Sequence, residues 1–489
     1  MRLLTLHPGK GTEAVKCSLK AYSLPSCPPY EALSYTWGPA NNPQRILFDD
    51  DQYFFSTQNL YDSLTHLRYP DKPRVLWVDA ICINQDDDKE KSQQLKNMHR
   101  IYSRAQQVLV WLGKSANSSD KAFQWIAEEP KRAQILFHEM LKVLKLKPDF
   151  LDLMRKEGLT GPHGAELRAL AAKIRIPAYD LDLIEPMVAL QKRPYFRRVW
   201  VIQETFHAKK IQVYCGNNNV EWDTFVSACN SFWHSPRARK HYPDGEGGLP
   251  GPSKLAAVRK EKEKSTIDLF RNFDEPLRSM LTVSLKLIQF NSMDFGQKIS
   301  AIFKLAKNTV NKVVPVKEEP PFRHLLPVLL NYWNFDASDP KDKVYALLNL
   351  TWMKGIHIDY SEDWSIADVL KNTAHAIIAE SGSLNILTVS KCSRPTKNFL
   401  PSWAPDWTDF DDKVLAFQIN PRYSKYAMES PFKRAFTATK ESKLPAPSVN
   451  GNILTLSGYL IDQIVEVGPV LAHHALDLET QASKYIVLL

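Results

Sequence analysis

The sequence predicts an α/β protein whose N-terminal part is a mainly parallel sheet flanked by helices. Strand-like and helix-like patterns alternate along residues 1–230, an order that favours a parallel sheet. A strand, a helix and a second strand follow one another within residues 75–112. The 489 residues are 44% hydrophobic and 24% charged, which is typical of a globular chain with two or three domains.

The first expected strand is residues 30–35, which end at the Trp37-Gly38-Pro39 turn. A hairpin of residues 46–48 and 53–55 follows, with three aspartates between its strands. A helix is expected from Ser56, because leucines recur beyond it at helical spacing. These leucines are Leu60, Leu64 and Leu67.

Residues 75–83 form an apolar run that we interpret as a buried strand broken by Asp79. Asp86–Asp88 are suited to a helix start, and apolar residues then recur at helical spacing up to Ala105. Residues 108–112 are the returning strand. A parallel crossover of this kind is right-handed in nearly every known case.

The remaining chain divides into less regular parts. We expect a helical insertion over 115–190, a helix over 193–207, and a strand and turn over 211–222. An N-terminal α/β domain would then fill residues 1–230, followed by a linker and helical segment over 231–320 and a C-terminal α+β region over 321–489. A strand pair beginning at Asn450-Gly451 supplies the β part of that last region.

Composition narrows the function classes. No run approaches the roughly 18 apolar residues of a membrane-crossing helix, and no secretion signal develops at the N-terminus. We therefore expect a cytoplasmic protein. Its thiols should be reduced, because the six cysteines show neither a CxxC pair nor metal spacing. The net charge of +9 lies in segments without stacking aromatics, so nucleic-acid binding is not favoured. No glycine-rich phosphate loop is present.

Three N-terminal blocks carry a family resemblance. They are YEALSYTWG (30–38), LWVDAICINQDDDKEKSQQLKNMHRIYSRAQQVLVWLG (76–113) and RPYFRRVWVIQE (193–204). Together they resemble the fungal heterokaryon-incompatibility (HET) domain. Residues 339–350 and 400–407 resemble sequences that often follow this domain. Tyr195 and Asn349 depart from the family pattern, where tryptophan and glycine are commoner.

The resemblance implies a function in fungal non-self recognition and programmed cell death, with the HET domain as the death-inducing part. HET domains have been likened to Toll/interleukin-receptor (TIR) domains, some of which cleave NAD. The segment WVIQE is similar to the TIR helix that carries a catalytic glutamate, which places that role on Glu204. A carboxylate against the ribose can stabilise the oxocarbenium-like transition state of glycosidic cleavage. Nicotinamide leaves without protonation, so one carboxylate suffices.

Candidate substrate-binding residues follow from the expected topology. In a parallel sheet the loops after neighbouring strands emerge at one edge, where a ligand sits. Trp37 could stack on a base, and Asn84 and Gln85 could bond ribose or phosphate. On the third motif we expect Arg197, Trp200 and Glu204 to share one helical stripe. The full candidate set is Tyr35, Trp37, Gly38, Asp79, Asn84, Gln85, Arg197 and Trp200, with Glu204 as the catalytic residue.

Structural interpretations of the same residues stay open. Trp37 could be a core aromatic, and Asp79 could satisfy backbone donors or an arginine. Glu204 could form a salt bridge with Arg197 or Arg198.

Two functions are compatible with the sequence: a NAD-cleaving death effector, or a non-enzymatic module that associates and recruits a separate effector. No cofactor is required, NAD is a possible substrate, and the expected partners are copies of the chain or other incompatibility proteins. We also expect residues 231–489 to restrain the N-terminal domain.

Overall fold

The structure is a computed structural model. It describes residues 1–129, 181–234, 238, 251–259, 322, 324–381, 384–389, 400–409 and 448–455, except residues 12, 50, 51 and 354. The chain divides into two compact units, Met1–Met428 and Glu429–Leu489. Within the described part, no helix is both long and apolar enough to cross a membrane.

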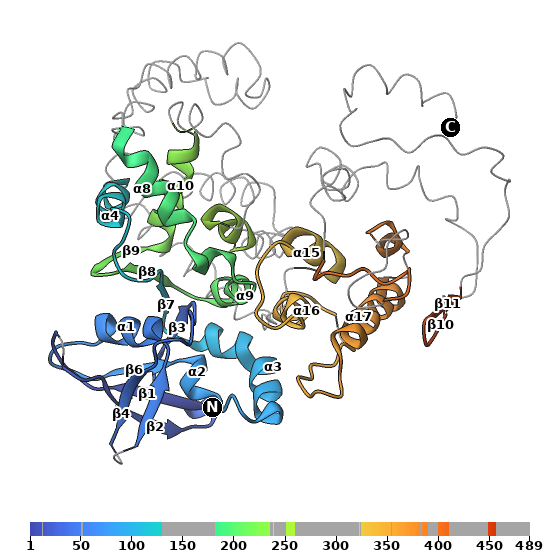
Figure 1. Cartoon of the computed structure of the whole chain (residues 1–489), viewed down its shortest axis with the longest axis horizontal. Helices are drawn as coiled ribbons and strands as arrows, with labels where there is room; N and C mark the ends of the chain where they lie inside the picture. The colour runs from blue at the N-terminus through green and yellow to red at the C-terminus, as the bar shows by residue number, and fades with distance from the viewer. Residues whose placement is uncertain are drawn as a thin grey trace, which may run out of the picture. The chain divides into compact units, whose positions relative to one another are not determined.

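A nine-stranded sheet organises the first unit (Figure 1). Its order is β5-β4-β2-β1-β6-β3-β7-β8-β9. The strands are β1 (Arg2–Leu6), β2 (Lys16–Ala21), β3 (Glu31–Tyr35), β4 (Gln44–Phe48), β5 (Tyr53–Ser56), β6 (Arg74–Trp77), β7 (Val108–Trp111), β8 (Ile211–Cys215) and β9 (Asn218–Glu221).

Four central strands, β6, β3, β7 and β8, run parallel, as predicted. Antiparallel neighbours extend the sheet on both sides: β1 pairs with β6, and β9 with β8. The sheet is therefore mixed as a whole. β1 and β2 were not anticipated from the sequence, whereas the hairpin β4–β5 was. The two strands of the expected crossover, β6 and β7, do not pair with each other, because β3 lies between them.

Helices α1 (Gln58–Leu67) and α3 (Asp88–Arg104) cover opposite faces of the sheet. The strand register places Trp77 and Trp111 on opposite faces, because successive side chains alternate along each strand. The Trp111 ring contacts His66 of α1, with ring centroids 5.0 Å apart, and the Trp77 ring contacts Tyr102 of α3 at 5.5 Å. The three leucines predicted to share one face of α1 are buried.

Both helix starts follow capping chemistry. The Thr57 side chain accepts a hydrogen bond from the Leu60 amide at 3.4 Å. The Asp87 carboxylate accepts from the amides of Lys89 and Glu90 at 2.9 and 3.0 Å. Each cap satisfies amides that have no partner within their own helix. The serine–threonine and aspartate signals therefore located both helices within two residues of their observed starts.

The rest of the described part of the first unit is mainly helical. Its elements are α2 (Asp79–Cys82), α4 (Ser119–Ala127), α8 (Ile184–Gln191), α9 (Trp200–His207), α10 (Trp222–His234), a helix at 252–259, α15 (Leu325–Tyr332), α16 (Asp342–Leu348) and α17 (Ile366–Ser381), with short 3-10 turns η1 (Leu24–Ser26), η2 (Leu181–Leu183), η3 (Pro194–Arg197) and η5 (Asn385–Val389). Most of the expected 115–190 insertion and of the 231–320 segment lies outside the described residues.

In the second unit, β10 (Ser448–Asn450) and β11 (Ile453–Thr455) form an antiparallel pair. Gly451 lies in the turn with φ +58°, a conformation that favours glycine. The rest of the expected strand pair, beyond residue 455, lies outside the described residues.

Candidate functional site

The loops after β3 and β6 meet at one edge of the sheet. These strands are parallel neighbours, so their carboxyl ends point the same way. The indole Nε1 of Trp37 donates a hydrogen bond to Oδ2 of Asp79 at 2.8 Å. The expectation that the two segments converge is therefore confirmed. Trp37 is 39% exposed, so it is not a core residue, and its ring marks the outer surface of the site.

The Trp37-Gly38 turn is fixed by the first turn of α1. The Thr57 hydroxyl donates to the Trp37 carbonyl, and the Asn59 amide donates to the Thr36 carbonyl, both at 2.5 Å. Gly38 has φ +76°, a left-handed conformation that costs an L side chain energy. Gly38 therefore contributes backbone shape to the site.

Asn84 and Gln85 hold the loop that follows α2. The Gln85 side chain donates to the backbone carbonyl of Asp79 at 3.0 Å. The Asn84 side chain accepts a hydrogen bond from the Asp86 amide at 3.3 Å, and the backbone amide of Asn84 donates to the Glu90 carboxylate at 3.1 Å. Both side chains thus already have partners within the loop, although Asn84 is exposed.

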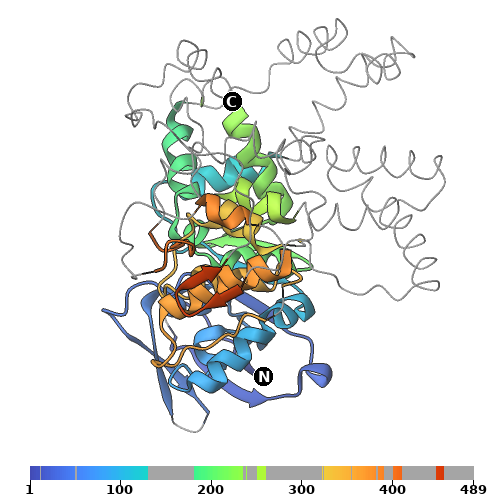
Figure 2. The ribbon, with the colours of Figure 1, turned by 90° about the vertical axis from the view of Figure 1, so that its right-hand side faces the viewer.

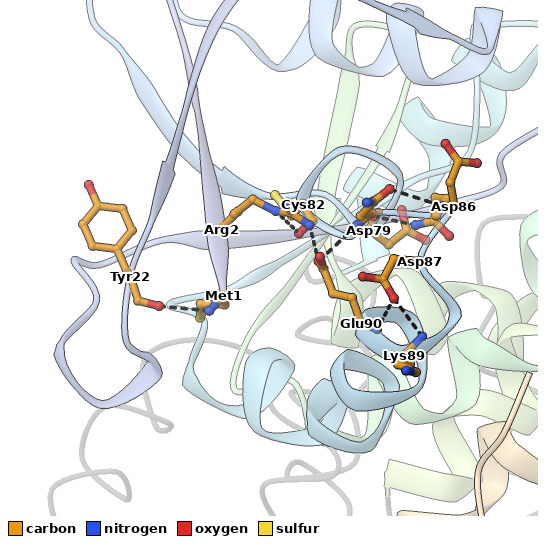
Figure 3. Close-up of polar contacts among 11 residues, drawn as sticks. Met1, Arg2, Tyr22, Asp79, Cys82, Asp86, Asp87, Lys89 and Glu90 are labelled. Carbon is orange, nitrogen blue, oxygen red and sulfur yellow. Dashed lines mark hydrogen bonds and ion pairs between the residues drawn. The ribbon is translucent and has the colours of Figure 1, made fainter.

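The same loop is tied to the first strand (Figure 3). Arg2 of β1 donates to the Cys82 carbonyl at 3.0 Å and forms an ion pair with Glu90 of α3. Cys82 is buried, and burial raises the pKa of its thiol to about 12. The thiol therefore stays protonated near neutral pH, which argues against a nucleophilic role. Among the described residues, no group of three His, Cys, Asp or Glu side chains is arranged to hold a metal.

Glu204 lies beneath the end of β3 and is only 2% exposed. The Ser34 hydroxyl donates to its Oε2 atom, and the hydroxyls of Ser34 and Tyr195 are 2.9 Å apart. Burial raises the pKa of Glu204 to about 7. The Arg198 guanidinium and the Ser34 hydrogen bond partly oppose this rise, whereas the negative charge of Asp79 adds to it. Glu204 therefore titrates nearer to neutral pH than an ordinary glutamate does.

Arg198 joins the parts of this site electrostatically, although the candidate set did not include it. Its guanidinium donates to the Tyr35 carbonyl at the end of β3. Burial disfavours its charge, but the carboxylates of Glu204 and Asp79 outweigh burial and keep its pKa above the usual value. Of the two arginines considered as partners of Glu204, Arg198 is the one whose charge acts on it, whereas Arg197 pairs with Asp336. The paired arginines in the third motif were the signal available in the sequence.

Tyr35 and Tyr102 complete the buried surroundings. Both are about 1% exposed, and burial raises the pKa of each hydroxyl well above its usual value, with Asp79 and Glu204 adding to the effect. The Tyr102 hydroxyl donates to the Leu33 carbonyl at 3.1 Å. Tyr102, Ser34 and Tyr195 were missed as site residues, because each looks like an ordinary core position in the sequence.

Arg197 does not share a helical stripe with Glu204, so that part of the expectation is wrong, whereas Trp200 and Glu204 lie four residues apart on α9, as expected. The predicted helix over 193–207 is interrupted: Pro194–Arg197 form a 3-10 turn, Arg198 is extended, and α9 begins at Trp200. Arg197 points to the surface, where its Nε atom lies 2.8 Å from Oδ2 of Asp336. The Trp200 side chain lies near the Asp342 carboxylate of α16 and lowers its pKa, which partly opposes the rise caused by burial.

The site is thus a polar network between the first and third motifs, with Trp37 at its surface and Glu204 at its base.

Comparison with known proteins finds a family match over the span of the three motifs. Residues 30–204 match the family described as Heterokaryon incompatibility protein (HET), so this part of the chain carries a HET domain.

A curated relative extends the match. The chain is 28% identical to Heterokaryon incompatibility protein 6, OR allele, of Neurospora crassa, over an alignment that covers 96% of this chain. The chain spans 64% of the length of that relative. No solved structure matches the chain, so the likeness to TIR domains stays a prediction.

Proposed function

We propose that the chain is an effector of heterokaryon incompatibility, whose HET domain triggers fungal cell death after non-self recognition. The family match over all three motifs and the name of the Neurospora crassa relative support this proposal. The effector acts in the cytoplasm and associates with copies of itself or with other incompatibility proteins. Its HET domain works as a signalling module that recruits a separate death effector.

The observation that carries this mode of action is the burial of Glu204. A catalytic carboxylate must contact the sugar that it stabilises. The Glu204 side chain is 2% exposed and already accepts a hydrogen bond from Ser34. Its surroundings favour a structural role, in which a buried carboxylate and Arg198 join β3, α2 and α9.

NAD cleavage is the second candidate, and the contact between Trp37 and Asp79 favours it. An exposed indole with its N–H on a carboxylate is a suitable platform for a nucleotide base, and the charge of Asp79 reaches both Arg198 and Glu204. For cleavage, Glu204 must exchange its Ser34 hydrogen bond for contact with the ribose. That exchange requires a rearrangement at the end of β3.

The two functions are separated by measuring free nicotinamide. The full chain, crowded or tagged to force association, is incubated with NAD alongside Glu204→Gln and Glu185→Gln. Glu185 is an exposed residue of α8 and serves as a matched control for the loss of a carboxylate. We expect no nicotinamide release above background from any of the three proteins.

Expression in fungal cells supplies the second measurement. The wild type and Glu185→Gln should kill cells, and a folded Glu204→Gln should kill equally well if the domain acts as a signalling module. Release of nicotinamide by the wild type and Glu185→Gln, but not by a folded Glu204→Gln, would overturn this mode of action and establish the enzyme.

A further inference from the structure

β5 ends the nine-stranded sheet on one side, and its outer edge pairs with no other strand in the part of the chain that the structure describes. Tyr53 and Phe55 of β5 are 53% and 52% exposed, the highest values among the large hydrophobic residues described in the first unit. Their rings meet edge to face, with centroids 5.1 Å apart. In Figures 1 and 2 the blue N-terminal strands lie at one end of the first unit, and α8 and α10 lie at the other. An exposed aromatic pair thus marks the edge of the sheet.

The main-chain groups of this aromatic pair point away from the sheet. The ladder between β4 and β5 begins with a hydrogen-bonded pair, because the Phe48 amide donates to the Gln52 carbonyl at 2.9 Å. Hydrogen-bonded and non-bonded pairs alternate along an antiparallel ladder. Tyr53, the next residue, therefore belongs to a non-bonded pair, and so does Phe55. The amides and carbonyls of both residues are directed away from β4, in the plane of the sheet.

The other side of β4 agrees with this direction. Leu47 is the residue of β4 that pairs with Tyr53. Its amide donates to the Val15 carbonyl, next to β2, at 3.0 Å, so it does not point at β5. Outward N–H and C=O groups on the last strand of a sheet form a template for pairing with an added strand. The outer edge of β5 can therefore accept one more strand.

The exposed face beside this edge is basic. The guanidinium carbon of Arg45 lies 5.2 Å from the Tyr53 ring centre and 5.8 Å from the Phe55 ring centre, so the cation extends over β5. Lys16 of β2, in register with Leu47, adds a second exposed cation on the same face. The strands β2, β4 and β5 contain no acidic residue. A partner of complementary charge is therefore acidic.

The opposite face of β5 suits an apolar side chain. Phe54 points to this face together with its partner Ile46, because side chains alternate along a strand. Ile46 is fully buried and Phe54 is half-buried, and α1 packs on β4. An aliphatic residue of an added strand would lie beside Phe54 and extend this contact. Asp49 lies in the hairpin turn beyond Tyr53, so the acidic residues of a partner belong at the Arg45 end.

We propose that the outer edge of β5 binds an extended, acidic peptide segment of a partner protein, which joins the sheet as an additional strand. Acidic side chains at alternate positions of the segment pair with Arg45, and the aliphatic residue between them packs beside Phe54. The main chain of the segment bonds the outward groups of Tyr53 and Phe55. The inference rests on the proposed function, because it supplies the surface through which a separate effector is recruited.

Peptide binding tests the charge of the partner. A short fluorescein-labelled peptide in which glutamate and valine alternate is titrated with the full-length protein, and fluorescence anisotropy reports binding. A peptide with lysine in place of glutamate should bind at least ~10-fold more weakly. Arg45→Glu should weaken binding of the glutamate peptide about fivefold and strengthen binding of the lysine peptide. Lys210→Glu, an equal charge change at an exposed site before β8, should alter neither.

Tyr53→Pro and Tyr53→Thr separate main-chain pairing from ring contacts. Both remove the ring, but proline also removes the outward amide, which does not bond β4. The glutamate peptide should bind at least ~5-fold more weakly to Tyr53→Pro than to Tyr53→Thr, because a carbonyl of the peptide loses its donor. Urea unfolding should show similar stability for the two variants, since the hydrogen bonds between β4 and β5 are intact in both.

Each outcome decides the proposal. Weaker binding by Tyr53→Pro than by Tyr53→Thr, together with the reversed charge preference of Arg45→Glu, supports strand addition. Equal binding by the two folded Tyr53 variants overturns it, and so does equal binding of the glutamate and lysine peptides. Exposed aromatics beside cations also suit a lipid surface, so vesicles of phosphatidylcholine and phosphatidylserine are the comparison. Wild type that sediments with these vesicles but does not bind the glutamate peptide would overturn the proposal.

The proposal and the proposed function can fail separately. Peptide binding is measured on purified protein, whereas killing is measured in cells. A wild type that kills cells without binding the peptide would overturn the β5 site alone. A wild type that binds the peptide as expected but does not kill cells would count against the proposed function and leave the β5 site in place.

Discussion

The Ser34 hydroxyl donates a hydrogen bond to the carboxylate of Glu204, and this bond joins the first motif of the HET domain to the third. Both side chains are almost completely buried. A buried carboxylate needs a donor because the unpaired charge would be costly. The stability of the domain should therefore depend on pH through this pair.

Glu204 makes the folded state more stable at mildly acid pH. Its folded pKa, about 7, lies above the ordinary value of 4.5. Between these values the folded state binds more protons than the unfolded state, so the free energy of unfolding falls as pH rises. In Glu204→Gln, the decrease in the free energy of unfolding between pH 5 and pH 8 should be about 2 kcal/mol smaller than in the wild type.

Urea unfolding of both proteins at pH 5 and pH 8 measures this difference. Asp342, whose pKa burial raises to about 6, titrates in both proteins, and its contribution cancels. Equal pH dependence in the two proteins would show that Glu204 does not titrate in this range.

Ser34→Ala should destabilise the domain more at pH 8 than at pH 5. The hydroxyl stabilises the ionised form of Glu204, so its loss leaves a charged acceptor unpaired at high pH. The expected cost at pH 8 is roughly 1–3 kcal/mol, as for other buried charged groups that lose a partner. Ser63→Ala is the control, because Ser63 is equally buried and donates to the Leu60 carbonyl. The cost of the control should be the same at both pH values; a pH-independent cost in Ser34→Ala would contradict the pairing.

Two glycines with positive φ should differ in their tolerance of alanine. At Gly38, φ +76°, an added Cβ would lie 3.4 Å from Asn59, an ordinary contact, so the cost is the backbone strain of about 1 kcal/mol. At Gly216, φ +55°, it would lie 2.3 Å from the Ser115 hydroxyl and 2.9 Å from the Ser115 amide nitrogen. Gly216→Ala should therefore lower the free energy of unfolding by at least ~2 kcal/mol more than Gly38→Ala does, as measured by thermal or urea unfolding. Equal losses would contradict the observed packing of the β8–β9 turn.

Alkylation should distinguish two cysteines. In the folded chain at pH 8, Cys82 should react with iodoacetamide at least ~100-fold more slowly than Cys27, because its thiol is buried and protonated. Cys27 is only partly buried. Peptide mass spectrometry measures both rates, and in urea the two should become similar. Rapid native labelling of Cys82 would reopen a nucleophilic role.

Local patterns predicted much of the fold. The strand ending at Tyr35, the hairpin around Asp49–Asp51, and the helix capped by Thr57 depend on neighbouring residues and were found where expected. β1 was not anticipated because Arg2–Leu6 is a short apolar run that resembles many others. Its place between β2 and β6 is decided by pairing over long separations, which local patterns do not contain.

The site was predictable in part. Convergence of Trp37 and Asp79 followed from the parallel topology. The prediction that Arg197 and Glu204 share one stripe assumed a continuous helix. The backbone between these two residues is instead extended at Arg198, which forms a β-bridge with Asp336. Partners that lie 139 residues away, as Asp336 does from Arg197, leave no local signal. Burial of Glu204 likewise depends on how the strands and helices pack.

The placement of β3 between β6 and β7 has a consequence for exchanging segments between related HET-domain proteins. The strand of the first motif is bordered on both sides by strands from the second, and β7 in turn pairs with β8, beyond the third. In a chimera joined between residues 38 and 74, β3 would come from one parent, and both strands that pair with it, β6 and β7, would come from the other. Recombinants that transfer residues 30–215 as one block should stay folded far more often than those that split it.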